Sequence, residues 1–361
     1  LRLTSIFFEN KDKENINKLI IQIIIISGLI SIFTSFLIIF FEKTIALKVY
    51  NNNQMNGILK IFAISLPFYT FMQIQKSLFK SFKLPEISNF SDIGSILFVT
   101  CLLIFFFKII AFNISIYRIS LFFLISCMLI FSINNFMLFY HVISNIKILK
   151  INNYLDIKKN LVKTLPDYFV IDFVNYIIVW GSIFLCTFFY DAASIGSFSS
   201  TYWLAFSLLF FPIVLNSIYA PNFAINSNKQ NKNKLKRIFN QNRKISLILT
   251  IPFFLIIFIF SDFFLKFFLN ISSSEYILIL RILLINSLMR LIFGPQVLFL
   301  NMSDNQKKLK KISVLAAILQ IILIFISAKY FDLIILSIAF LLSNLIKHIF
   351  LKIELEKYLK T

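Results

Sequence analysis

The chain alternates between long apolar runs and short polar segments. A membrane-spanning helix needs roughly 20 apolar residues at a rise of about 1.5 Å each. Backbone groups inside a bilayer must form their hydrogen bonds internally, and the runs do not alternate as barrel strands do. We therefore predict an all-α polytopic membrane protein. The ten predicted spans are residues 19–41, 58–79, 92–111, 116–139, 164–190, 195–222, 245–269, 275–300, 312–330 and 332–351.

The positive charges fall in every second polar segment between these runs. One set of segments (1–18, 80–91, 140–163, 226–244, 301–311 and 352–361) holds 25 Lys and Arg residues, and the alternate set holds two. Basic segments mark the cytoplasmic side of a membrane. Both ends of this chain are therefore predicted to be cytoplasmic. We expect an N-terminal bundle at 1–140, a cytoplasmic linker at 141–163 and a C-terminal six-helix bundle at 164–361.

The composition supports a membrane protein and argues against nucleic-acid binding. Hydrophobic residues make up 59% of the chain and charged residues 14%, whereas a soluble domain has about 45–50% and about 25%. The net charge of +20 comes from short segments that form no continuous basic face, so no nucleic-acid partner is expected.

The sequence offers no catalytic or metal-binding pattern. The cysteines Cys101, Cys127 and Cys186 lie far apart in apolar runs, and the histidines His141 and His348 are expected at helix ends. There is no glycine-rich phosphate loop, no GxSxG and no cluster of carboxylates. We predict no metal, no cofactor and no enzyme activity. If the chain transports a substrate, the energy would then come from a gradient or from a separate protein.

Two segments of the chain form an internal repeat. Residues 58–83 align with 279–304 at a shift of 221, and each segment carries a proline, Pro67 or Pro295. Parallel repeats related by an axis along the membrane normal are a known transporter plan. The second half begins with two helices, 164–190 and 195–222, before the helix at 245–269, whereas the first half begins directly at the corresponding helix 19–41. We therefore expect two spans upstream of Leu1 in a protein of twelve or more helices, a natural ten-span protein being the alternative.

Intramembrane charges are costly and usually face a cavity or a partner. Asp262 and Lys266 are spaced to form an ion pair. The lysines Lys60, Lys76, Lys108, Lys266, Lys329 and Lys347 lie near span ends and are expected to reach an interface.

Three arginines are candidate substrate contacts. Arg290 lies about 15 Å from Leu300 along a helix, so it cannot reach the interface easily. Arg281 points to the opposite face nearer the outer interface, and Arg118 is shallow. A guanidinium binds phosphate or carboxylate bidentately. The alternative is a structural Arg290 that pairs with Asp172 or caps carbonyls freed at a helix break.

A second candidate site lies in the stretch LPDYFVIDFVNY at 165–176. Asp172 lies about 12 Å into its helix, and Asn175 shares its face. Asp172 is a candidate for H⁺ or Na⁺ coupling, with inter-helix hydrogen bonding as the alternative. Gly294, Pro295 and Pro67 are candidate hinge residues, because proline inside a membrane helix allows kinks.

Several motifs resemble the polysaccharide-export flippases. Leu165-Pro166 leads an Asp-containing helix, and the turn Ile195-Gly196-Ser197-Phe198-Ser199 follows. The stretch YAPNFA at 219–224 resembles the end of the family's eighth helix. GPQVLFLNMSDNQKKLKK resembles the end of its tenth helix, although Asp304 replaces the expected glycine.

This resemblance implies membership of the multidrug/oligosaccharidyl-lipid/polysaccharide exporter superfamily. The fold would be MATE-like, with two six-helix bundles around a cationic cavity in a bacterial inner membrane. The cargo would be an oligosaccharide on undecaprenyl pyrophosphate (an O-antigen or capsule repeat unit), with Arg290 as a diphosphate or acidic-sugar contact. The implied partners are this lipid-linked oligosaccharide, membrane lipids, H⁺ or Na⁺ as a coupling ion, and other polysaccharide-assembly proteins.

Three other functions remain open at this point. A cation-coupled multidrug antiporter of the same superfamily would favour acidic residues in its cavity, whereas this chain has a deep arginine. A membrane-bound polysaccharide polymerase or acyltransferase would require a long external loop or an intramembrane His/Asp pair. A scaffold without transport activity would not need intramembrane charges.

Overall fold

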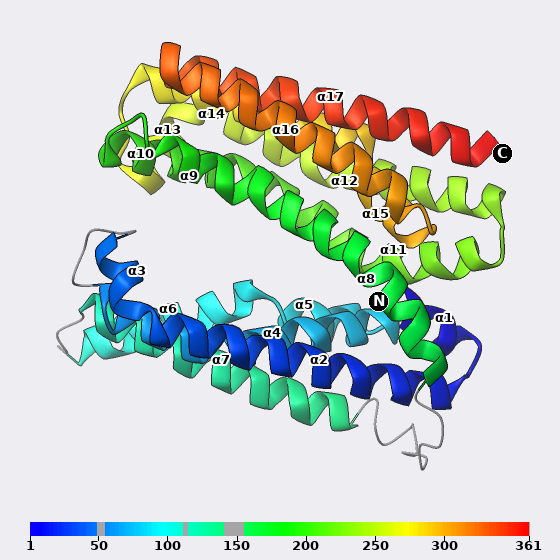
Figure 1. The fold of residues 1–361 in the computed structure, drawn as a ribbon. Coiled ribbons are helices and arrows are strands. Elements are labelled where there is room, and N and C mark those ends of the chain that lie inside the picture. Colours follow the sequence, from blue (N-terminus) through cyan, green and yellow to red (C-terminus); the bar gives the residue numbers. More distant parts are fainter. Residues whose placement is uncertain (49–54, 111–114, 141–154, 361) are drawn as a thin grey trace. The chain divides into compact units, whose positions relative to one another are not determined.

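The computed structural model describes residues 1–48, 55–110, 115–140 and 155–360, and every regular element within these ranges is helical (Figure 1). Nine helical segments of the described residues are long and apolar enough to cross a membrane. The one remaining predicted span, 92–111, corresponds to a shorter apolar helix at Ile93–Ile109. The all-α polytopic fold is therefore confirmed.

Large apolar side chains cover the outside of the helices. On the helix Lys13–Phe40, Leu29, Phe33 and Phe40 are 67%, 62% and 70% exposed. A soluble monomer rarely exposes a continuous apolar surface of this kind. Lipid is the medium in which such a surface is stable, so the chain is a multi-pass membrane protein.

The chain divides into two compact units, Leu1–Lys159 and Asn160–Thr361. Residues 141–154 of the predicted linker 141–163, and with them His141, lie outside the described residues. Each unit has its own core.

The first unit is organised around one central helix, α4 (Figure 1). This helix contacts α2 and α7, and α6 packs on α7. Met72, Ile96, Cys127 and Ile130 form a buried core there. The helices of this unit are α1 (Arg2–Glu9), α2 (Lys13–Phe40), α3 (Glu42–Lys48), α4 (Ile58–Ser81), α5 (Pro85–Phe90), α6 (Ile93–Ile109) and α7 (Ile116–Leu138).

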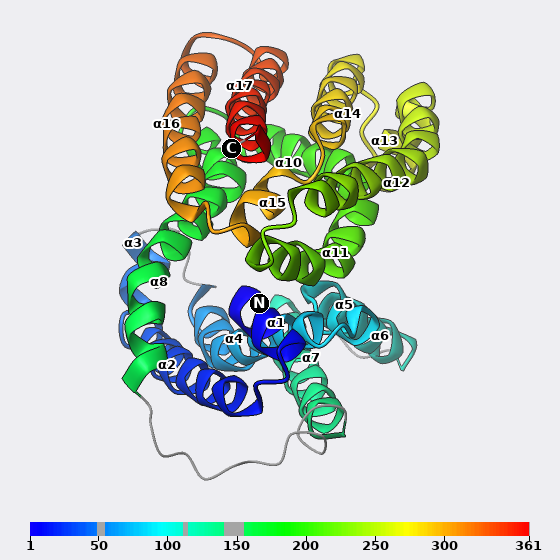
Figure 2. The same ribbon diagram turned by 90° about the vertical axis from the view of Figure 1, so that its right-hand side faces the viewer.

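The second unit is larger, and four of its predicted spans (164–190, 195–222, 245–269 and 275–300) are interrupted. Its central helix α14 contacts α10, α12 and α17, and α16 packs on α17 (Figure 2). The elements are α8 (Leu155–Tyr176), which begins in the first unit, a π-helical turn (Ile177–Gly181), α9 (Ser182–Cys186), α10 (Ala192–Phe206), a 3₁₀ turn (Ser207–Leu209), α11 (Phe210–Asn228), α12 (Lys232–Ile259), α13 (Ser261–Leu269), α14 (Ser274–Phe293), α15 (Gln296–Met302), α16 (Gln306–Tyr330) and α17 (Leu333–Lys360).

The internal repeat is visible in the helix order and contacts. Adding 221 to the bounds of α2 gives 234–261, which overlaps α12. The same shift places α4 on α14 and α15, α6 on α16 and α7 on α17. The contacting pairs also correspond, since α2–α4, α4–α7 and α6–α7 match α12–α14, α14–α17 and α16–α17. The two halves thus share one packing plan.

Several basic segments predicted as loops are helical. The helix α12 begins at Lys232, where the side chain of Asn231 accepts a hydrogen bond from the Lys234 N–H at 3.0 Å. The helix α17 runs to Lys360, nine residues beyond the predicted end of its span. Charged side chains at a helix end cost little where they reach the headgroup region or water, so the helices extend past the apolar runs.

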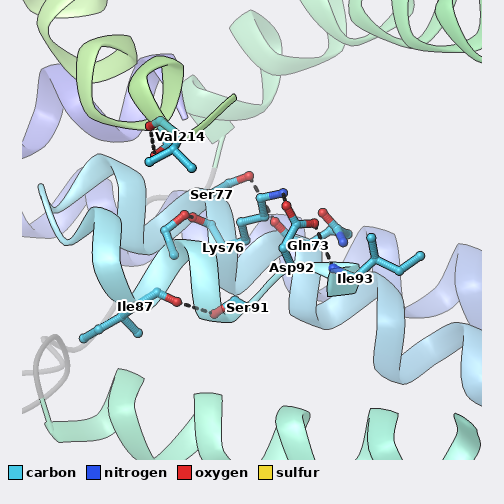
Figure 3. A network of polar contacts seen from close by, with 10 residues as sticks. Gln73, Lys76, Ser77, Ile87, Ser91, Asp92, Ile93 and Val214 are labelled. Atoms are coloured by element: carbon cyan, nitrogen blue, oxygen red, sulfur yellow. Dashed lines mark hydrogen bonds and ion pairs between the residues drawn. The ribbon is translucent and has the colours of Figure 1, made fainter. Parts of the chain in front are cut away.

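A polar network connects α4 to the start of α6 in the first unit (Figure 3). Lys76 Nζ lies 2.6 Å from Asp92 Oδ2, and the other carboxyl oxygen of Asp92 caps the Ile93 N–H at 2.8 Å. Ser88 Oγ donates to the Lys76 carbonyl. Lys76, which was expected to reach an interface, thus pairs with the carboxylate that caps α6. The predicted Asp262–Lys266 pair is present at 2.7 Å.

Candidate functional site

Arg290 lies in the last turn of α14, inside the second unit. Its guanidinium carbon is 5.8 Å from the centroid of the Phe206 ring. In the described part of the chain it has no hydrogen-bond or ion-pair partner. Neither Asp172 nor a freed backbone carbonyl binds it, so both structural alternatives named above are absent from this geometry. Five N–H donors remain for another acceptor.

Two more basic side chains come from α17. Lys347 and His348 are 8% and 7% exposed. Lys347 Nζ donates to Asn175 Oδ1 at 3.2 Å, and His348 Nδ1 lies 2.9 Å from Gln296 Oε1. Lys347 was predicted to reach an interface and His348 to lie at a helix end. Both predictions are wrong, because α17 continues to Lys360 and places the two residues near its middle.

These residues line a cavity of about 190 Å³, here called the inner chamber. No carboxylate is present among the described residues that line it. At roughly 30 Å³ per water, the chamber has room for about six waters, which suits a single phosphate-sized group better than a sugar chain. Its polar lining consists of Asn175, Tyr202, Arg290, Gln320, Asn344, Lys347 and His348.

A second cavity of about 150 Å³, here called the break chamber, adjoins the first. Both are lined by Arg290, Val297 and His348, so these residues form the shared wall. Asn242 donates to Asn216 at 3.2 Å and accepts from Ser246 at 3.3 Å on its far side. The interior of the second unit is therefore polar and basic around Arg290.

The break chamber borders the interruption between α14 and α15. Gly294 has φ +76° and ψ −169°, a backbone conformation that is essentially confined to glycine. A Cβ there would lie 3.0 Å from Phe239 Cζ and 3.1 Å from Arg243 Cδ. The predicted break at Gly294 and Pro295 is therefore real in the backbone. Pro67, by contrast, lies inside the uninterrupted helix α4.

A π-helical turn shapes the opposite side of the inner chamber. Ile178 and Val179 of this turn line the cavity. Gln320 Nε2 on α16 donates to the Ile178 carbonyl and to Ser182 Oγ, both at 2.9 Å. Such turns are frequent at functional sites. The Ile178 carbonyl accepts from both Ser182 Oγ, at 2.8 Å, and Gln320.

The structure brings Asn175 and Arg290 together but separates the other candidates. Asp172 is exposed on α8 beside the stacked Phe169 and Phe173 rings, whose centroids are 6.0 Å apart, and does not line the chamber. Arg281 lies over the Phe258 ring at 5.5 Å and lines neither chamber. Arg118 belongs to the first unit, in the first turn of α7.

Sequence reasoning missed Lys347, His348 and Gln320. A usable signal was present, because Asn344, Lys347 and His348 are spaced i, i+3, i+4 within an apolar run. This spacing puts all three on one helix face. A polar face inside an otherwise apolar span indicates a cavity or a partner.

The chain is similar to known proteins in both sequence and fold. A family model described as polysaccharide biosynthesis protein matches residues 9–277. No curated protein sequence matches the chain.

Solved MATE and MOP superfamily transporters have a similar fold. An outward-facing MATE family multidrug resistance transporter is 10% identical, with a TM-score of 0.75, over 99% of this chain and 82% of that one. A MOP superfamily transporter from Pyrococcus furiosus is 11% identical, with a TM-score of 0.77 and the same coverage of 99% and 82%. The Vibrio cholerae MATE transporter VcmN in its bent form is 13% identical, with a TM-score of 0.72, again over 99% and 82%. At these identities the likeness establishes the MATE-like fold.

Proposed function

This chain belongs to the polysaccharide biosynthesis protein family, and from this premise we propose that it is a flippase for a lipid-linked oligosaccharide. The cargo is an O-antigen or capsule repeat unit on undecaprenyl pyrophosphate. The protein carries it from the cytoplasmic to the outer leaflet of a bacterial inner membrane by alternating access. Both ends of the chain lie on the cytoplasmic side, as the distribution of Lys and Arg indicates.

One observation supports this cargo above others. The Arg290 guanidinium is inside the second unit, has no acceptor among the described residues, and shares a chamber with Lys347. Arg290 is only partly exposed, and charges withdrawn from water in a protein interior are usually paired. A diphosphate would supply acceptors in the geometry that a guanidinium binds bidentately. We assign Arg290 and Asn175 to the chamber that receives the anionic group. For Arg118 of the first unit we keep substrate binding as a separate proposal.

The break between α14 and α15 gives the chamber a means of responding to cargo. Gly294 and Pro295 form a wall of the break chamber, four and five residues after Arg290. Arg290, Gln296 and His348 all line the break chamber. A change of backbone conformation at Gly294 and Pro295 would therefore move Arg290 relative to Gln296 and His348. Hinges of a few residues that absorb such changes are common in transport and closure motions. We propose this role for Gly294 and Pro295.

One structure with a similar fold is described by the polarity of its binding pocket. The Pyrococcus furiosus MOP transporter is described as having a binding pocket of reverse polarity that suggests a different function. The inner chamber of this chain is basic and, in the residues described, is lined by no carboxylate. We infer from this basic lining that the chamber favours an anionic cargo over a cationic one.

An accumulation assay in a deletion strain tests the proposed function. Loss of the gene should leave lipid-linked repeat units facing the cytoplasm, where a membrane-impermeant sugar oxidant applied from outside cannot reach them. Re-expression of the wild-type chain should restore labelling. Complete outside labelling in the deletion strain, with no other flippase present, would exclude this activity.

The second candidate is a cation-coupled multidrug antiporter. The exposed carboxyl of Asp172 favours it, because this group has no hydrogen-bond or ion-pair partner among the described residues. Asp172→Asn separates the two functions. An antiporter that couples through Asp172 would lose drug efflux in this variant, whereas a flippase that uses Arg290 would retain export of its repeat unit. Full repeat-unit export with no drug efflux in the wild type would eliminate the antiporter.

A further inference from the structure

A third cavity in the second unit lies outside the two chambers described above. It has a volume of about 670 Å³ and lies between α12, the break after α14 and the last turns of α17. Cavities of about 300–1,000 Å³ are typical of ligand sites. This cavity, here called the basic pocket, is lined by Lys232, Lys236, Arg243, Gln296, Lys352 and Glu356.

The positive charges of the basic pocket are mostly unpaired. Lys352 lies 3.9 Å from Glu356, and both are more than half exposed, so this pair is weak. The side chains of Lys232, Lys236 and Arg243 form no ion pair or hydrogen bond with any residue the structure describes. Three basic side chains from one helix therefore converge on a single ligand-sized space.

These three residues occupy one face of α12. Positions 232, 236 and 243 are separated by four and seven residues, which places them in line along a helix. Lys234 and Lys244 lie on the same helix and are exposed but do not line the pocket. The charges are thus divided between a face that lines the cavity and a face that does not, and this division provides a matched control.

The inner end of the basic pocket adjoins the interior of the unit. Gln296 lines both the basic pocket and the break chamber, and its side chain is bonded to His348 at 2.9 Å. Arg243 approaches the break itself, because its Cγ and Cδ lie 3.2 Å and 3.1 Å from the position of a Cβ on Gly294. Arg243 therefore packs against Gly294, and a ligand bound to Arg243 would lie next to the break between α14 and α15.

We propose that the basic pocket is a second anion site, separate from the inner chamber, that binds a phosphate-bearing group. Lysine offers a mobile point charge and arginine a planar fork, and both are suited to phosphate oxygens. The inference goes beyond the flippase activity, since it does not depend on the identity of the cargo. The phosphate belongs to an acidic lipid headgroup or to a soluble phosphate compound, and the experiment distinguishes the two.

The test uses the full chain in nanodiscs of phosphatidylcholine, with inorganic pyrophosphate as the titrant and calorimetry as the measurement. Each chain is measured with and without Arg290→Ala, which separates binding in the basic pocket from binding in the inner chamber. The double variant Lys236→Gln/Arg243→Gln should weaken pyrophosphate binding at least roughly tenfold, since two charged contacts are lost. The control Lys234→Gln/Lys244→Gln removes the same charge from the same helix and should stay within about twofold of wild type. Monodisperse elution of each variant in size-exclusion chromatography establishes that it is folded.

Two outcomes would overturn the proposal. Equal weakening by the two double variants would mean that pyrophosphate responds to the overall charge of α12 and not to a site. Loss of binding in Arg290→Ala, with binding retained in the pocket variant, would place pyrophosphate in the inner chamber.

A second arm of the experiment identifies the source of the phosphate. Nanodiscs containing phosphatidylglycerol should weaken pyrophosphate binding in the wild type by competition if a lipid headgroup is the natural ligand. Unchanged binding supports a soluble phosphate compound. Both results support the site, provided that the pocket variant loses pyrophosphate binding.

Discussion

Replacing Arg290 with alanine tests whether this residue acts in transport or only stabilises the structure. The structure allows the stability cost of Arg290→Ala to be estimated, because the Arg290 side chain has no hydrogen bond or ion pair with a described residue. The Arg290 guanidinium carbon lies 5.8 Å from the centroid of the Phe206 ring, and a cation–π interaction contributes about 0.5–2 kcal/mol. Relief of repulsion from Lys347, which lines the same chamber, offsets part of that loss. The net cost should be about 1 kcal/mol or less.

This small cost corresponds to a small change in melting temperature. The second unit has 202 residues (160 to 361). For a domain of 150–250 residues, 1 kcal/mol shifts the melting temperature by about 2–4 °C. Arg290→Ala should therefore melt within about 4 °C of wild type.

The loss of transport should be much larger. A hydrogen bond to a charged group contributes about 1.5–3 kcal/mol, and 1.4 kcal/mol is a factor of ten. Loss of a bidentate contact to a diphosphate should lower export at least roughly tenfold to hundredfold. Arg290→Lys keeps the charge without the fork and should retain part of the export.

The assay pairs thermal melting of the purified protein with export of repeat units in a deletion strain. The expected result is near-native melting with strongly reduced export in Arg290→Ala and intermediate export in Arg290→Lys. A variant that melts more than 10 °C lower, or one that exports normally, would refute the reasoning. The first outcome would make Arg290 structural, and the second would remove it from the transport path.

Two further predictions concern the backbone break and the ion pair of the first unit. Gly294→Ala should destabilise the protein by about 1–3 kcal/mol, because alanine is strained at φ +76° and its Cβ would crowd Phe239 and Arg243; thermal melting measures this loss. Lys76→Met should cost about 1–3 kcal/mol, because it leaves the partly buried Asp92 carboxylate without its 2.6 Å partner. The double variant with Asp92→Asn should cost less than the sum of the two single changes, as measured in a double-mutant cycle.

Matched controls exist for both changes. An alanine Cβ at Gly94 in α6 would meet nothing within 4 Å, so Gly94→Ala should leave the melting temperature unchanged or raise it. Lys266 and Asp262 form an exposed pair whose loss should cost about 0.2–1 kcal/mol. Equal effects at Gly294 and Gly94 would contradict the role of the backbone conformation. Strict additivity at Lys76 and Asp92 would mean that this pair contributes no coupling.

The spans could be predicted because each is long and uniformly apolar, and the bilayer permits few backbone solutions. Their interruptions were harder to predict. The break at Gly294 and Pro295 follows from residue types with special backbone preferences. The π-helical turn at Ile177–Gly181 is harder to predict. The Ile178 carbonyl in this turn accepts from the nearby Ser182 Oγ and also from Gln320, which lies far away in the sequence.

Only part of the candidate site could be predicted, because the local sequence pattern reveals Arg290 but not Lys347. Arg290 is conspicuous because it is charged and near the middle of an apolar run. Lys347 lies close to the end of its run, where a long side chain can usually reach the interface. Its burial depends on the extension of α17 to Lys360 and on Asn175 of another helix. These are tertiary facts that the local sequence pattern does not contain.

The difference between the two halves of the repeat has an electrical consequence. With the shift of 221, the position of Arg290 is held by Tyr69 in the first unit, so the permanent charge belongs to one half alone. Moving one elementary charge through a membrane potential of 100 mV involves about 2.3 kcal/mol. A motion that carries the inner chamber through the field would respond to voltage, and a bound anionic group would cancel much of that response. The loaded and empty steps of the transport cycle would then differ in their voltage dependence, which current measurements on planar bilayers can record.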